Sequence, residues 1–189
     1  MEKRHNYAAA GFLLLGIGTA GRAFLGVPEG VTMAELSLTV LLVIGALLLT
    51  RQGLAALVCG LAATALELVL CGSWVQAGGA LAAAAPFLRL ADLWLLLGLV
   101  WGSLPAARRA VDDLKYTRST RMMLVACGVL LAAHTVLRIA SLAAPASLAA
   151  PASVPLGKAS SGSFVVFSVL LLWYTVLMVK AYNVQRTKH

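Results

Sequence analysis

Ionisable side chains interrupt several long apolar stretches of this chain, and they are the residues best suited to bind a ligand or exchange a proton. They are three arginines, three carboxylates and one histidine: Arg22, Glu35, Glu67, Arg89, Asp92, His134 and Arg138. The three positive charges balance the three negative ones, which leaves His134 uncommitted. A charge in hydrocarbon costs several kcal/mol unless it is paired or hydrated, so these residues mark either a functional site or an internal ion-pair network.

Helical spacing places some of these residues on common faces. Arg89 and Asp92 are three residues apart and His134 and Arg138 are four apart, so each pair shares one face of a helix. The predicted ion pairs join residues of opposite sign at similar depth: Arg22 with Glu35, Glu67 with Arg89, and Asp92 with Arg138.

Two interpretations of this pattern stay open. In the first, three ion pairs hold the helices together without any ligand. In the second, the residues line a polar cavity that binds a polar or anionic small molecule, because the planar donors of arginine match two oxygens of a carboxylate or phosphate at once. The candidate ligand-binding residues are Arg22, Glu67, Arg89, Asp92, His134 and Arg138.

Common catalytic and cofactor motifs are absent from the sequence. There is no zinc-protease, nucleophile-elbow, P-loop or dinucleotide motif in a plausible context. One histidine within the apolar segments cannot supply both axial ligands of a b-type haem. Cys59, Cys71 and Cys127 form no CxxC pair and are expected to be small packing residues. We therefore expect no catalytic residue, metal or cofactor.

The composition identifies the environment in which these residues must be placed. Of the 189 residues, 61% are hydrophobic and only 12% are charged, and the mean hydropathy is +0.91. Soluble domains carry about twice that share of charge, so a soluble or disordered chain is excluded. The sequence predicts an all-α integral membrane protein that forms one domain, residues 1–189, in the lipid bilayer.

About 20 apolar residues are needed for a helix to cross a ~30 Å hydrocarbon core. That length identifies six expected transmembrane helices: residues 7–26, 34–50, 54–73, 84–104, 122–143 and 163–182. Loops are expected between them, and the longest are 105–121 and 144–162. The hexapeptide Leu142–Ser147 runs into the second of these loops and is repeated exactly as Leu148–Ser153, and its proline and alanine favour an extended spacer.

Basic residues predict the orientation. Eleven of the 15 Lys and Arg residues fall at the two termini or in the second and fourth loops, whereas the opposite loops contain only Lys158. Because positive charge is retained on the cytoplasmic side, both termini are expected inside. Most of the net charge of +8 is thereby placed on the cytoplasmic face of the membrane, where residues 108–121 are expected to face anionic lipid. Nucleic acid is therefore not an expected partner. Richness in Ala and Leu favours a bacterial inner (plasma) membrane.

This orientation places all seven ionisable residues in the outer half of the bilayer. A threonine precedes three of the charges by three residues, as Thr19, Thr64 and Thr135, each near the outer end of an odd-numbered span. The chain is therefore interpreted as three repeated two-helix hairpins, and membrane repeats often place a ligand near their shared axis.

At the level of architecture, six helices of this length with both termini inside and a polar pocket opening outward resemble the substrate-binding subunits of energy-coupling-factor vitamin transporters. The resemblance implies solute binding. The alanine motif by which those subunits dock their energising partner has no counterpart here, although residues 8–11 and 16–21 give the first span small-residue faces.

Three functions remain open at this point. The first is a solute-binding or transport protein, or a subunit of a transporter. The second is a non-catalytic structural or assembly subunit that binds partner membrane subunits. The third is a small membrane enzyme acting on a lipid or lipid-linked substrate, with Glu67, Asp92 or His134 as acid or base. The chain length favours the first two, so an enzyme is the less expected function.

Overall fold

The structure is a computed structural model that describes residues 2–26, 31–49, 54–72, 79–111, 114–143 and 149–187. Side chains are described for residues 7–26, 31–49, 54–72, 79–111, 118–143 and 158–187. In this part of the chain every element is an α-helix: α1 (Glu2–Leu25), α2 (Met33–Leu48), α3 (Leu54–Cys71), α5 (Ala80–Ala110), α6 (Leu114–Ala143) and α7 (Ala149–Thr187). The predicted all-helical fold is confirmed.

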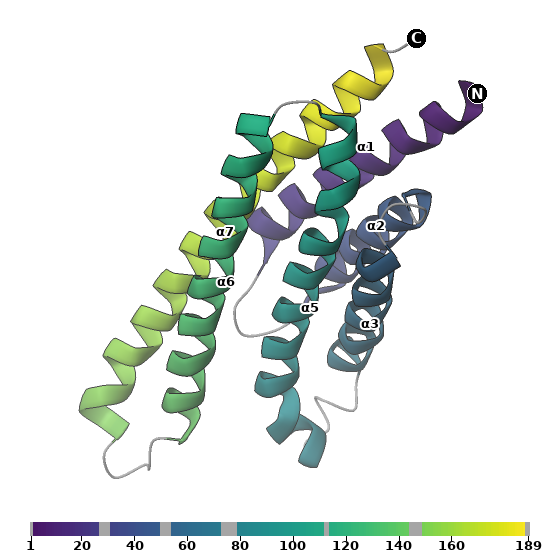
Figure 1. Cartoon of the computed structure of the whole chain (residues 1–189). Helices are drawn as coiled ribbons and strands as arrows, with labels where there is room; N and C mark the ends of the chain where they lie inside the picture. The colour runs from purple at the N-terminus through teal and green to yellow at the C-terminus, as the bar shows by residue number, and fades with distance from the viewer. Residues whose placement is uncertain are drawn as a thin grey trace.

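The helices form a bundle in which successive elements pack as hairpins (Figure 1). The most extensive contacts join α6 to α7 and α1 to α7, and the contacts of α1 with α2 and of α3 with α5 come next. Both chain termini and the connection from α5 to α6 lie at one end of the bundle (Figure 1). We call this the terminal end, and the other the distal end.

Five of the helices are long and apolar enough to cross a membrane, with candidate spans Tyr7–Leu25, Leu54–Cys71, Ala80–Ala110, Arg118–Ala143 and Lys158–Thr187. The sixth, α2, is apolar but has only 16 residues. At 1.5 Å per residue α2 measures about 24 Å, which is shorter than a ~30 Å hydrocarbon core.

Two predicted helix boundaries are corrected by the structure. The fourth helix was expected over residues 84–104, but α5 covers Ala80–Ala110 and contains both Pro86 and Pro105. The loop expected over 105–121 is helical except near Val111, and residues 112 and 113 lie outside the described part. An internal proline removes one backbone hydrogen bond, and the alanines beside Pro105 are strong helix formers that keep the helix continuous.

The expected spacer between the last two helices is also corrected. Residues 149–162 belong to α7, whereas residues 144–148 lie outside the described part. The extended conformation predicted for the Ala-Pro repeat is therefore wrong over residues 149–153. Pro151 lies in the first turn of α7, where its missing N–H would have no partner within the helix, so the proline is compatible with the helix start.

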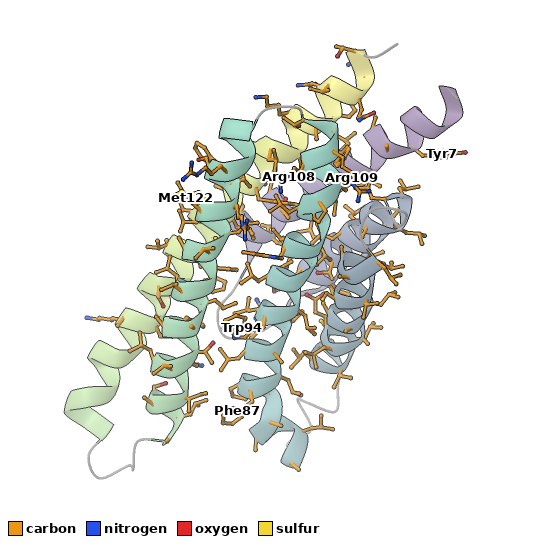
Figure 2. The ribbon with its side chains drawn as sticks, viewed as in Figure 1. Tyr7, Phe87, Trp94, Arg108, Arg109 and Met122 are labelled. Atoms are coloured by element: carbon orange, nitrogen blue, oxygen red, sulfur yellow. The ribbon has the colours of Figure 1, made fainter. Side chains whose placement is uncertain are left out.

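Apolar and charged residues are distributed in the reverse of the arrangement found in a soluble protein. Large hydrophobic side chains project outward (Figure 2), among them Phe24 and Met122, which are 75% and 66% exposed. By contrast, Arg22, Glu67 and Asp92 are at most 3% exposed. Exposing this apolar surface to water is energetically unfavourable, whereas exposing it to lipid is favourable. Together with the five long apolar helices, this distribution indicates a membrane protein.

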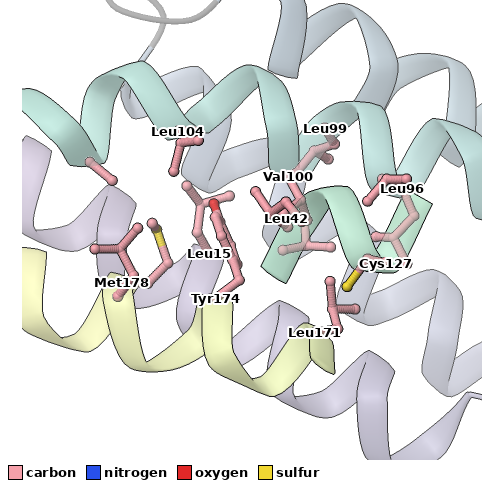
Figure 3. Packing of buried hydrophobic residues seen from close by; sticks show 14 of the residues in the cluster. Leu15, Leu42, Leu96, Leu99, Val100, Leu104, Cys127, Leu171, Tyr174 and Met178 are labelled. Atoms are coloured by element: carbon pink, nitrogen blue, oxygen red, sulfur yellow. The ribbon is translucent and has the colours of Figure 1, made fainter. Parts of the chain in front are cut away.

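Small residues allow the helices to approach closely. A Cβ atom added to Gly45 of α2 would lie 2.9 Å from the carbonyl oxygen of Gly11 in α1, and one added to Gly102 of α5 would lie 2.7 Å from the backbone nitrogen of Ala56 in α3. Such contacts replace the hydrophobic driving force that lipid does not supply. Towards the centre of the bundle, leucines of α1, α2, α5 and α7 interlock around Tyr174 and Met178 (Figure 3).

Candidate functional site: a buried ion cluster

Five ionisable residues from four helices meet inside the bundle and form what we call the ion cluster: Arg22, Glu35, Glu67, Arg89 and Asp92. Arg22 lies in the last turn of α1 and Glu35 in the first turn of α2. All five side chains are buried. The close crossings of α1 with α2 and of α3 with α5 bring these residues together.

Arg22 contacts carboxylates from three other helices. Its Nη1 atom lies 2.7 Å from Oε1 of Glu67 and 3.3 Å from Oε1 of Glu35. Its Nη2 atom donates to Oδ2 of Asp92 at 3.0 Å. One guanidinium therefore joins α1 to α2, α3 and α5.

Arg89 supplies the second positive charge. Its Nη2 atom donates to Oε1 of Glu35 at 2.6 Å, and its Nη1 atom donates to Oδ2 of Asp92 at 2.6 Å. Arg89 and Asp92 share a face of α5, as the three-residue spacing predicted. Glu35 and Asp92 are thus each held by both arginines.

Glu35 is also part of the helix cap of α2. Its Oε2 atom accepts from the backbone N–H of Thr32 at 2.9 Å, and the Thr32 hydroxyl accepts from the backbone N–H of Glu35 at 3.2 Å. This reciprocal arrangement is a capping box, and it satisfies backbone donors that the helix start leaves open. Both carboxylate oxygens of Glu35 are therefore occupied, one by the cap and one by the arginines.

Glu67 and Asp92 are satisfied less completely. Oε1 of Glu67 accepts from the Thr39 hydroxyl at 3.0 Å and forms an ion pair with Nη1 of Arg22, an atom that makes no hydrogen bond with a described residue. Oε2 of Glu67 and Oδ1 of Asp92 are buried and have no hydrogen-bond partner among the described residues. Both carboxyl groups are held by the guanidinium of Arg22, Glu67 by Nη1 and Asp92 by Nη2.

The charges of the cluster do not balance. Among the described side chains, three carboxylates share two guanidiniums, so full ionisation of these five groups gives the cluster one net negative charge. An uncompensated buried charge is strongly unfavourable, and a carboxyl group in that position takes up a proton to relieve it. A protonated carboxyl is also the form that can donate a hydrogen bond to a neighbouring carboxylate.

The cluster lies in the distal half of the bundle. Measured along α5 at 1.5 Å per residue, Asp92 is about 18 Å from Ala80 and about 27 Å from Ala110 at the terminal end. This position agrees with the common depth that the sequence pattern predicted for these residues.

His134 does not join the ion cluster. It lies on α6 and faces α7, where Nδ1 is 2.9 Å from the carbonyl oxygen and 3.1 Å from the hydroxyl of Ser160. Its ring packs against Phe164 with centroids 5.7 Å apart. Nε2 is buried and has no hydrogen-bond partner in the described part of the chain. The histidine is thus a contact between the last two helices.

Arg138 also lies outside the cluster. Its side chain is half-buried and makes no ion pair with any described residue. The predicted pair of Asp92 with Arg138 is therefore wrong, because Arg22 and Arg89 occupy Asp92. The predicted pair of Arg22 with Glu35 is confirmed. Glu67 was predicted to pair with Arg89, but in the structure it forms an ion pair with Arg22.

The repeated threonines bond to their own helices. Thr64 donates to the carbonyl oxygen of Gly60 at 3.0 Å and Thr135 to that of Leu131 at 2.7 Å, four residues back in each case. Thr19 makes the same kind of bond at 2.7 Å and also lies 3.1 Å from the Thr175 hydroxyl. They satisfy their hydroxyls locally.

Two polar residues of the site were not singled out from the sequence. Thr32 precedes Glu35 by three residues, which is the spacing of a capping box, and this signal was available. Thr39, which bonds Glu67, follows Glu35 by four residues on the same face of α2, but a lone threonine in an apolar helix carries no distinguishing signal.

Two cavities lined by described residues open on the bundle surface, the first of them beside Gly26, which adjoins Glu35. One, of about 290 Å³, lies between α1 and α7 beside Phe164, and the other, of about 430 Å³, lies at the terminal end of α3, α5 and α6. Neither is lined by a cluster residue. No group of His, Cys, Asp and Glu residues in the described ranges is arranged to hold a metal ion.

No family model, curated protein or solved structure matches this chain significantly. The architectural resemblance to vitamin-transporter subunits thus receives no support from the solved structures, and the function must be argued from the site itself.

Proposed function

We propose that this chain is a multi-pass membrane transport protein, or the membrane subunit of a transporter, in which the ion cluster binds a coupling proton. In this proposal the proton resides on Glu67 or is shared between Glu67 and Asp92. Carboxylates that bind and release protons inside the bilayer are a recurring element of ion-coupled transporters. The sequence carries no ATP-binding motif, so active transport by this chain alone requires an ion gradient.

The observation that carries the proposal is the excess of carboxylate in a buried cluster. Glu67 and Asp92 each keep one buried oxygen without a hydrogen-bond partner among the described residues, and both carboxyl groups contact the same guanidinium, that of Arg22. A proton on one of them removes the excess charge and supplies a donor to the other. Glu35 differs from them, because its Oε2 is occupied by the cap and its Oε1 by both arginines.

A proton fits the cluster better than the anionic solute considered from the sequence. Both guanidiniums are already bound by carboxylates at 2.6–3.3 Å. An anionic solute must displace one of those carboxylates, whereas a proton enters without rearrangement. Solute binding near the cluster therefore requires a second conformation, which protonation of a carboxylate favours by weakening its hold on Arg22.

The proposed topology has six membrane passes with both termini in the cytoplasm. Its support is the position of both termini at one end of the bundle (Figure 1) and the eleven basic residues assigned to that side. The short helix α2 then crosses with its capping box in the outer half. The three hairpins α1/α2, α3/α5 and α6/α7 are proposed to be structural repeats, and their direct packing supports this.

Proton movement is the direct test. The purified protein is reconstituted in liposomes containing a pH-sensitive dye, and a set of organic anions and zwitterions is added outside under an imposed pH gradient. A transporter of this kind shows solute-dependent proton flux in the native protein and none in Glu67→Gln. If every solute leaves the flux at the level of empty liposomes, proton-coupled transport by the isolated chain is wrong.

Isosteric substitutions test where the proton resides. Glu67→Gln mimics a protonated Glu67 and preserves an acceptor for Arg22 and Thr39, so its unfolding free energy in detergent stays close to that of the native protein. The matched variant Glu35→Gln removes an ionised group held by both arginines and by the cap, so it is destabilised by about 3–5 kcal/mol. Equal losses in the two variants contradict a proton on Glu67.

A structural or assembly subunit is the second candidate function. The observation in its favour is that ion pairs among the five residues join α1, α2, α3 and α5, as a network that only holds helices together would do. If Glu67 proves to be ionised and the reconstituted protein moves no protons, the structural or assembly role is the correct one. The enzyme hypothesis has the least support, since His134 contacts Ser160 and lies apart from the carboxylates.

A further inference from the structure

The cavity of about 430 Å³ at the terminal end combines positive charge with an apolar wall. Its lining comes from the start of α3, the last turns of α5 and the start of α6, and it includes Arg108 and Arg121 together with Trp101 and Leu54. None of the described residues that line it is acidic. The volume is within the usual range for small-molecule sites.

The two arginines come from different helices, Arg108 from α5 and Arg121 from α6. Both are exposed, and neither forms an ion pair with a described residue. Two guanidiniums converging on one cavity match the oxygens of a phosphate group, to which arginine donates in bidentate fashion. Figure 2 shows Arg108 near the end of α5, beside the connection to α6.

The apolar wall of the cavity continues onto the outer surface of the helices. Leu54 is 67% exposed and Trp101 is 41% exposed, and both line the cavity. A tryptophan beside basic residues at a helix end is typical of the membrane interface, where the indole ring lies at headgroup level. An acyl chain leaving the cavity would lie against these side chains.

We propose that this cavity binds one anionic phospholipid, whose phosphate contacts Arg108 and Arg121 and whose acyl chain lies against Trp101 and Leu54. The two arginines by themselves could equally bind free inorganic phosphate. The continuous apolar wall favours the lipid, because a free phosphate ion gains nothing from it. This site is more specific than the general attraction of a basic loop to anionic lipid, since it requires two particular arginines.

Retention of lipid by the intact protein tests the proposal. The full-length protein is purified in detergent, mixed with phosphatidylglycerol or with phosphatidylcholine of the same acyl chains, and analysed by native mass spectrometry. One phosphatidylglycerol molecule is expected to be retained and phosphatidylcholine is not. Because a hydrogen bond to a charged group contributes about 1.5–3 kcal/mol, Arg108→Ala and Arg121→Ala should each weaken retention by about ten-fold or more.

Arg109 and Arg118 provide matched controls on the same two helices. Both are exposed arginines, and neither lines the cavity. Arg109→Ala and Arg118→Ala should retain the phospholipid as the native protein does. Equal loss in all four variants would show a diffuse charge effect and overturn the site.

Inorganic phosphate and glycerol phosphate serve as competitors that lack acyl chains. The proposal expects neither to displace phosphatidylglycerol at millimolar concentration, and it expects Trp101→Ala to weaken lipid retention. Displacement by inorganic phosphate, together with an unaffected Trp101→Ala variant, would assign the cavity to the free ion and contradict the lipid.

Discussion

Arg22 and Glu67 are 45 residues apart in sequence, yet Nη1 of Arg22 lies 2.7 Å from Oε1 of Glu67 inside the bundle. The same guanidinium also binds Asp92. Two buried carboxylates, from α3 and α5, are therefore held by one guanidinium. This arrangement makes Arg22 the residue on which the cluster depends most.

Replacing Arg22 by Gln should destabilise the fold strongly. Glu67 and Asp92 would face each other without the cation that joins them, and breaking a buried ion pair from one side costs about 3–5 kcal/mol. The measurement is the unfolding free energy in detergent micelles. Arg138→Gln is the control, because Arg138 is half-buried and outside the cluster, and it should cost about 1 kcal/mol or less. Similar losses for both variants would contradict the central role of Arg22.

Replacing Gly102 by Ala should loosen the contact between α3 and α5. The new Cβ would lie 2.7 Å from the backbone nitrogen of Ala56, so one helix must shift, at a cost of about 1–3 kcal/mol. Gly128 in α6 is a matched control, since its added Cβ would meet only Leu97 at 3.7 Å. Gly128→Ala should be neutral or stabilising by up to about 1 kcal/mol. If the melting temperature of Gly102→Ala equals that of the native protein, α3 and α5 are packed less tightly than the 2.7 Å distance indicates.

Tyr174 of α7 and Ser103 of α5 share a buried hydrogen bond between their hydroxyl groups. Tyr174→Phe and Ser103→Ala should each destabilise the protein by about 1 kcal/mol, and the double variant should lose less than the sum of the two. The coupling energy from this double-mutant cycle measures the bond. A coupling energy of zero would mean that the hydroxyls do not interact.

Cysteine labelling tests the proposed topology. Cys71, at the distal end of α3, is half-buried, and its thiol lies 3.5 Å from the carbonyl oxygen of Val31. If both termini are cytoplasmic, a membrane-impermeant thiol reagent should label Cys71 in intact cells. Cys127 is buried and Cys59 lies deeper in the apolar part of α3, so both should stay unlabelled. Labelling of Cys71 only in inverted vesicles would reverse the orientation.

The membrane character and the all-helical fold could be predicted from the sequence. Hydropathy and helical periodicity depend on residues that are near one another in the chain, so each apolar segment carries its own signal. The adjacency of Arg89 and Asp92 on one helix face followed from the same periodicity. Helix ends were predicted less well, because the Ala-rich segments around Pro105 and after residue 148 continue as helix.

Only the tertiary structure decided which charges meet. Arg138 and Arg22 have the same charge and were predicted at similar depth, but α6 packs chiefly on α7 and contacts α5 little, so Arg138 lies away from Asp92. Arg22 reaches three carboxylates because small residues let α1 cross α2 closely and α3 approach α5. The rotation and crossing of helices depend on packing between distant segments, which no local pattern encodes. The excess carboxylate in the cluster became apparent only when Arg138 proved to lie outside it.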